Sequence, residues 1–297
     1  MKKMIYAAMA VVSMSYSAPA MAQSQDLQTK VNAYFTETLK AQQTVLEKAD
    51  REAFSRNKPS DTKLQLAIKG KDVTGYQKMV WTAWCEANKS LKEEKLMEAE
   101  DLKLAKHSSW NIPACLEPDA VMPYYYGKKG VAADGKYPLF LYVHGSGPKD
   151  HEWENGIQLG LRFKDSPSIY FIPQIPNEGE YYRWWHLSKQ YAFEKLIRQS
   201  MVNGDVDANR LYVFGISEGG YGSQRLASFY ADYWAAAGPM AGGEPLKNAP
   251  VENCANIGFS FLTGADDTGF YRNDLTWYTQ VAFDSAQLAR PLAVDNT

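Results

Sequence analysis

The feature that most constrains this sequence is an apolar run that ends in a turn flanked by glycines. Residues 210–214 read Arg-Leu-Tyr-Val-Phe, and Gly215-Ile216-Ser217-Glu218-Gly219 follows, with a segment rich in Ala, Gln, Arg and Leu behind it. In a tight turn between a strand and a helix, a Cβ atom at Gly215 or Gly219 would collide with the neighbouring chain, and Ser217 is held in a strained backbone conformation. The pattern therefore predicts a strand, a sharp turn and a helix, the unit from which α/β folds are built.

The texture of the chain after Pro113 agrees with such a fold, because short apolar runs closed by Gly, Pro and Asp alternate with amphipathic segments. We expect strands at 122–126, 137–143, 168–172, 211–214, 234–237 and 257–262, and helices at about 185–202, 219–230 and 273–289. Several of these strands are apolar throughout, as strands covered on both faces are. The alternation predicts an α/β fold with a mostly parallel sheet and helices on both faces.

The first 105 residues follow a different plan. Lys2 and Lys3, an apolar run over 4–12 and Ala20-Met21-Ala22 predict a signal peptide over residues 1–22. The protein is then exported, to the periplasm or the extracellular space. No other apolar stretch approaches the roughly 20 residues that a membrane span needs. Apolar residues at helical spacing predict helices over 26–54 and 76–88, with 92–106 as a continuation, so residues 23–105 form a helical N-terminal region ahead of the α/β domain over 106–297.

Charge and cysteine content narrow the classes of partner. The formal net charge is −2, and the mildly acidic balance argues against nucleic acid as a partner. The three cysteines have no spacing typical of a metal site, and nothing in the sequence implies a metal or an organic cofactor.

A second glycine-rich turn, His144-Gly145-Ser146-Gly147, directly follows the apolar strand that ends at Val143. The order of the two turns, on successive strands, resembles the α/β-hydrolase family, in particular its secreted esterase and polyester-depolymerase-like branches, from about residue 120 onward. The resemblance implies that Ser217 is the nucleophile of a nucleophile elbow. It also implies an oxyanion hole made by the N–H of Glu218 and an N–H of Gly145 or Ser146, while His144 holds that loop by hydrogen bonding.

The same resemblance places the acid after the next strands, in the order Ser, Asp, His. The family usually carries its acid three residues after the glycine that ends such a strand, which selects Asp267 after Gly264, with Asp266 as the alternative. Asp267 would orient a histidine and stabilise its imidazolium form.

The histidine itself departs from the family pattern, because all four histidines of the sequence precede Ser217. Three explanations stay open. The domain is C-terminally incomplete and lacks its last strand and helix, or His186 or His151 supplies a relocated base, or the fold is kept for binding without catalysis.

An aromatic segment, Tyr181-Tyr182-Arg183-Trp184-Trp185-His186, follows the strand at 168–172. Tyr182, Trp184 and Trp185 could form a platform for sugars or aromatic acyl groups. The alternative is that these rings cover the sheet and pin the helical region.

These observations favour an exported serine hydrolase that forms an acyl-enzyme from a small or polymeric carboxylic ester. A serine peptidase of the same fold and a non-catalytic glycan-binding relative are the alternatives. The sequence does not define an oligomeric state.

Overall fold

The computed structural model describes residues 26–41 and 68–286. The expected signal peptide lies outside these residues, as do residues 42–54 of the first expected helix and residues 287–297. Contacts divide the chain into two compact units, 1–93 and 94–297. Within the described ranges, none of the helices has the length and apolar character needed to traverse a bilayer.

The first unit contains a helix over 26–41, the 3₁₀ turn η1 (Gly70–Asp72) and the helix α3 (Val73–Lys89). Leu39 packs against Ala87 and Leu91, with Phe35 beside them. Both described segments agree with the amphipathic helices that the apolar spacing predicts.

The segment 92–106 differs from its expectation, because the backbone leaves helical geometry after α3. It holds the short strand β1 (Glu100–Asp101) and the 3₁₀ turn η2 (Leu102–Leu104). Side chains of another helix satisfy its backbone: Leu96 N–H donates to Gln199 Oε1 at 2.6 Å, and Gln199 Nε2 donates to the carbonyl of Glu94 at 2.9 Å. These contacts replace the hydrogen bonds that a helical continuation would make.

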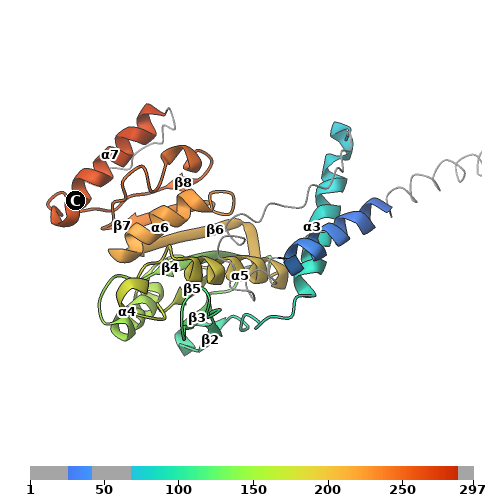
Figure 1. Cartoon of the computed structure of the whole chain (residues 1–297), viewed down its shortest axis with the longest axis horizontal. Helices are drawn as coiled ribbons and strands as arrows, with labels where there is room; N and C mark the ends of the chain where they lie inside the picture. Colours follow the sequence, from blue (N-terminus) through green and yellow to red (C-terminus); the bar gives the residue numbers. More distant parts are fainter. Residues whose placement is uncertain (1–25, 42–67, 287–297) are drawn as a thin grey trace, which may run out of the picture. The chain divides into compact units, whose positions relative to one another are not determined.

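The second unit is built on a sheet whose eight described strands run in the order β1-β3-β5-β4-β6-β7-β8, with β2 paired to β3 (Figure 1). Pairing is parallel except where β3 meets β2 and β5. The strands after β1 are β2 (His107–Asn111), β3 (Val121–Lys129), β4 (Tyr137–Val143), β5 (Ser168–Pro173), β6 (Val206–Ile216), β7 (Ala236–Met240) and β8 (Gly258–Phe259). The helices are α4 (Lys149–Arg162), α5 (Leu187–Asn203), α6 (Glu218–Phe229) and α7 (Arg272–Ser285), with 3₁₀ turns η3 (Gly179–Tyr181), η4 (Val251–Cys254) and η5 (Gly269–Tyr271).

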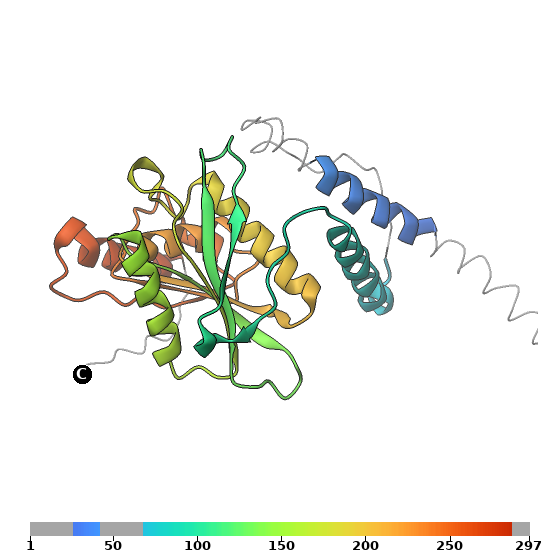
Figure 2. The same ribbon diagram turned by 90° about the horizontal axis from the view of Figure 1, so that it is seen from below.

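Helices cover both faces of this sheet, as Figure 2 shows. Successive side chains of a strand point to opposite faces, and β5 illustrates this. Ile172 contacts α4, where a Cβ on Gly156 would lie 3.0 Å from its Cγ2. Phe171 stacks on Trp110, which also contacts the Lys195 ammonium of α5. The predicted fold class, a mostly parallel α/β sheet with helices on both faces, is confirmed.

The helix α4 and the short strand β2 were not predicted from the sequence. The apolar pattern of α4 is interrupted by Gly156 and Gly160, which let the helix approach Tyr142, Tyr170 and Ile172 closely. The two glycines thus remove the periodic signal at the positions where the helix is packed most tightly.

Candidate active site

The site begins at the turn between β6 and α6, where Ser217 adopts φ 55° and ψ −115°. A Cβ atom on Gly219 would lie 1.9 Å from the carbonyl oxygen of Val143, and one on Gly215 would lie 2.4 Å from the same atom. Only glycine fits at either position, so the turn holds Ser217 at the carboxyl edge of the sheet in a conformation that L-residues rarely adopt. Its N–H donates to the carbonyl of Met240 at 2.9 Å, which fixes the turn to β7.

The loop after β4 lies directly beside this serine. A Cβ on Gly145 would be 3.5 Å from the Cβ of Ser217. Ser146 lines the same pocket as Ser217 and Glu218. The structure therefore brings together Ser217, the loop glycine Gly145, Ser146 and the first residue of α6, the four residues that the sequence places in nucleophile and oxyanion roles.

His144 holds this loop from inside the protein. Its side chain is buried, and its Nε2 accepts the N–H of Ile175 at 3.1 Å. The proton of the neutral ring therefore belongs on Nδ1, which lies 2.8 Å from the carbonyl of Gly145 and donates to it. Burial lowers the pKa of His144 to about 4. The ring is neutral near pH 7, as this pair of hydrogen bonds requires.

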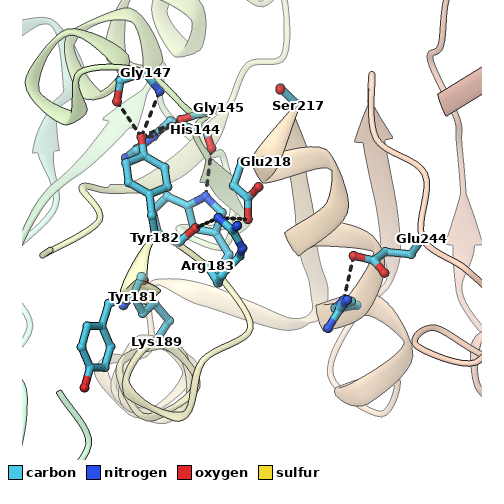
Figure 3. Close-up of polar contacts among 12 residues, drawn as sticks. His144, Gly145, Gly147, Tyr181, Tyr182, Arg183, Lys189, Ser217, Glu218 and Glu244 are labelled. Atoms are coloured by element: carbon cyan, nitrogen blue, oxygen red, sulfur yellow. Dashed lines mark hydrogen bonds and ion pairs between the residues drawn. The ribbon is translucent and has the colours of Figure 1, made fainter. Parts of the chain in front are cut away.

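Two residues of the aromatic segment complete the support (Figure 3). The hydroxyl of Tyr182 lies 2.9 Å from the carbonyl of Gly145 and 3.1 Å from that of Gly147, and its single proton is shared between these two acceptors. Trp184 Nε1 donates to the carbonyl of His144 at 2.9 Å. Both side chains are buried against the loop, whereas Trp185 lines the pocket. Of the three residues expected to form a substrate platform, two lie behind the loop and one faces the pocket.

Arg272, which the sequence did not single out, contacts Ser217. Its Nη2 donates to Ser217 Oγ at 3.1 Å, its Nε donates to the hydroxyl of Tyr221 at 3.2 Å, and its Nη1 lies 3.4 Å from Asp267 Oδ1. Two consecutive residues with left-handed backbone, Phe270 and Tyr271 (both φ 58°), turn the chain so that Arg272 enters the site. No repeat or motif signals such a pair, which is why sequence reasoning missed this arginine.

The two carboxylates considered for the acid lie in one turn. Asp267 is joined to Ser217 through Arg272, and its N–H donates to the carbonyl of Gly264. Asp266 precedes it and accepts the N–H of Thr268 through its backbone carbonyl.

The three histidines other than His144 lie on elements that do not carry Ser217, Asp267 or Arg272. His186 is the residue before α5, with its ring 5.8 Å from that of Tyr181. His151 on α4 is 3.1 Å from the amide of Asn155, and His107 on β2 packs against Tyr125 and Trp153. Arg272 is the side chain found hydrogen-bonded to Ser217 Oγ.

A pocket of about 370 Å³ opens over these groups. Its lining combines charged and aromatic side chains: Ser146, Arg183, Trp185, Ser217, Glu218, Tyr221, Glu244, Phe270 and Arg272. Across 26–41 and 68–286, no three His, Cys, Asp or Glu side chains are grouped so that they could hold a metal ion.

Comparisons with known proteins give backbone likenesses only. No model of a protein family matches the chain, and no curated protein matches its sequence. Among solved structures, a thermostable esterase matches 61% of this chain and 51% of its own, at 22% identity and a TM-score of 0.49. A fluorophosphonate-binding serine hydrolase of Staphylococcus aureus matches 62% of this chain and 87% of its own, at 10% identity and a TM-score of 0.47. A ferulic acid esterase matches the same shares at 14% identity and a TM-score of 0.46. The chain thus spans about half the length of the first of these proteins, and its function has to be argued from the site.

Proposed function

We propose that this protein is a serine hydrolase that cleaves carboxylic esters, with Ser217 as its nucleophile. The observation that carries the proposal is the backbone of Ser217, strained at φ 55° on a strand-to-helix turn, with the Gly145 loop against it. Strain of this kind costs on the order of 1–3 kcal/mol and persists where the surrounding structure enforces it, typically at functional sites.

In the proposed reaction Ser217 Oγ attacks the ester carbonyl, and the carbonyl oxygen becomes an oxyanion. The N–H groups of Glu218 and of Gly145 or Ser146 stabilise that charge, an effect worth about 3–4 kcal/mol for one donor in related chemistry. The alcohol leaves as the acyl–oxygen bond breaks, and water then releases the acyl group as a carboxylic acid. We assign Asp267 as the acid of the site, with Asp266 as the alternative.

Arg272 has an electrostatic part in this scheme. Burial opposes its charge, but the hydrogen bond to Tyr221 and the charge of Asp267 outweigh burial and raise its pKa. A guanidinium stays protonated and cannot accept the serine proton. It stabilises the anionic form of Ser217 Oγ. The proposed proton acceptor is His186, which precedes α5, or His151 on α4.

The remaining parts of the proposal concern location and substrate. We propose export to the periplasm or the extracellular space and a small or polymeric ester as substrate, with no nucleic-acid partner.

The test is labelling of the purified protein with a fluorophosphonate probe. Wild type and Ser285→Ala, which changes an exposed serine at the end of α7, should be labelled, and Ser217→Ala should not. Loss of labelling in His186→Ala would identify the base. A folded wild type that stays unlabelled, or labelling that survives Ser217→Ala, contradicts the proposal. Parallel panels of esters and peptides separate an esterase from a serine peptidase, and binding of glycans without labelling would indicate a non-catalytic protein.

A further inference from the structure

The charged side chains around the pocket are not equally accessible. In the pair Arg183–Glu218, 45% of the arginine side chain is exposed and 12% of the glutamate, with 3.6 Å between Nη1 and Oε1. In the pair Arg225–Glu244 the fractions are 26% and 3%, and Nε lies 2.7 Å from Oε1. Arg225 lies outside the pocket lining, and its Nε is buried. Among the charged side chains that do line the pocket, Arg183 (45%) and Arg272 (18%) are more exposed than Glu218 and Glu244, so the charges that a ligand reaches first are positive.

The environment of Glu218 strengthens this asymmetry. Burial raises the pKa of its carboxyl, the Arg183 charge opposes the rise, and the nearby charge of Glu244 adds to it. Its Oε1 is buried without a hydrogen-bond partner. A carboxyl in such a position holds its negative charge less readily than an exposed one.

The cations themselves are held in place. The guanidinium of Arg225 lies 3.9 Å from the centre of the Trp185 ring and that of Arg183 lies 6.0 Å from it. Arg272 is fixed by Tyr221 and Asp267, and it ends 3.1 Å from the oxygen that attacks the substrate. A fixed guanidinium is a strong partner for a carboxylate because little side-chain freedom is lost on binding.

We infer that the substrate is an ester that itself carries a carboxylate. Arg272 binds this carboxylate, and Arg183, at the exposed side of the pocket, attracts the substrate. This inference rests on the proposed function. A carboxylate oxygen lies about 2.8 Å from the guanidinium nitrogen that binds it, and the attacked carbon about 3–3.5 Å from the serine oxygen. With 3.1 Å between Nη2 and Oγ, the carboxylate oxygen and the attacked carbon lie at most about 9 Å apart. A short carbon chain spans that distance, so the substrate class is the monoester of a short dicarboxylic acid.

The chemistry of this step is ordinary ester hydrolysis. With monoethyl succinate, Ser217 Oγ displaces ethanol to form a succinyl-enzyme, and water releases succinate. No further reactant is needed.

The kinetic test compares monoethyl succinate with the ethyl ester of succinamic acid, which has the same size but no charge, followed by acid release at constant pH. Wild type should prefer the charged ester in kcat/KM. Arg272→Gln should reduce that preference by about 10- to 100-fold, since a hydrogen bond to a charged group is lost. Arg272→Lys, which keeps the charge, should restore part of it. Arg162→Gln, at an exposed position in the last turn of α4, should leave the preference unchanged.

A binding measurement keeps this inference separate from the proposed function. Calorimetry with Ser217→Ala, which cannot form an acyl-enzyme, should show tighter binding of monoethyl succinate than of the amide, and Ser217→Ala/Arg272→Gln should lose the difference. Hydrolysis of both esters at equal rates by wild type, or equal binding by Ser217→Ala, overturns carboxylate recognition and leaves the serine hydrolase intact. Selective binding by Ser217→Ala together with no hydrolysis by wild type would overturn the proposed function and retain the anion site.

Discussion

Replacing Tyr182 by phenylalanine tests whether the loop beside Ser217 is held by a single hydroxyl. The substitution keeps the buried ring and removes the oxygen that lies 2.9 Å from the Gly145 carbonyl and 3.1 Å from the Gly147 carbonyl. Burial raises the pKa of this phenol to about 12, so it remains a donor at every pH used in an assay. The Gly145 carbonyl would keep the Nδ1–H of His144 as its donor, whereas the Gly147 carbonyl would lose the hydroxyl, and a buried polar group left without a partner costs about 1–3 kcal/mol. We therefore expect Tyr182→Phe to lower the free energy of unfolding by about 1–3 kcal/mol.

The same change should also slow catalysis. Complete loss of one oxyanion donor lowers kcat by about 10²–10³-fold. Because Tyr182→Phe loosens the loop without removing the donor, we expect its kcat to fall by about tenfold to hundredfold. The assays are urea unfolding at equilibrium and steady-state ester hydrolysis, with kcat and KM separated. The matched control is Tyr181→Phe at the neighbouring, partly exposed tyrosine.

The kcat of Tyr182→Phe should fall with little change in KM, because the loop acts on the oxyanion and not on the bound ground state. If both tyrosine variants keep wild-type stability and kcat, the hydroxyl does not hold the loop and the reasoning is wrong.

Three further predictions concern the elbow, the loop and the buried charges. Gly219→Ala should abolish ester hydrolysis and lower the free energy of unfolding by about 3 kcal/mol or more, because the new Cβ would lie 1.9 Å from a backbone oxygen. The control is Gly264→Ala, where the nearest neighbour of the new Cβ lies at 3.9 Å. This variant should keep wild-type behaviour in urea unfolding and in hydrolysis. The pKa of His144 is about 4 in the folded state, below its ordinary 6.5. The neutral ring therefore contributes about 3 kcal/mol to the free energy of unfolding above pH 6.5, and this contribution is lost as the pH falls toward 4. The urea midpoints measured at pH 4.5 and 7.5 should differ more for wild type than for His144→Gln. Lys189→Met should lower the free energy of unfolding by about 3–5 kcal/mol, because the carboxylate of Glu117 stays buried without its cation. The double variant Lys189→Met/Glu117→Gln should regain much of this stability, as measured by thermal unfolding.

Parts of the fold and of the site could be predicted from the sequence where a local pattern of residues determines the structure. The strand from Tyr137 to Val143 was predicted with its observed bounds, because an apolar run closed by glycine needs no tertiary information. The turn at Ser217 was equally readable, since two glycines at fixed spacing are a steric requirement. These two elements locate the edge of the sheet where the site forms.

Other parts depend on contacts between distant segments. Arg272 reaches Ser217 only because two residues before it adopt left-handed backbone, and neither is a glycine that would announce the turn. From the sequence, Trp184 could form part of a pocket wall or a buried support, and the hydrogen bond from its indole to the His144 carbonyl distinguishes these two roles. Secondary-structure propensity cannot predict such contacts, because each contact joins two residues that are far apart in the sequence.

The support of the His144 loop has a consequence for the order in which the site is assembled during synthesis. Trp184 follows its partner by 40 positions, and Tyr182 follows the Gly145 carbonyl by 37. A ribosome therefore delivers the loop well before the side chains that fasten it, and Ser217 emerges later still. Until that stretch is made, the carbonyls of His144 and Gly147 lack the side-chain donors that hold them in the folded protein. A pause in translation between β5 and residue 182 would prolong the lifetime of an intermediate in which β3, β4 and β5 are made, while the loop is not yet fastened and β6 is still missing.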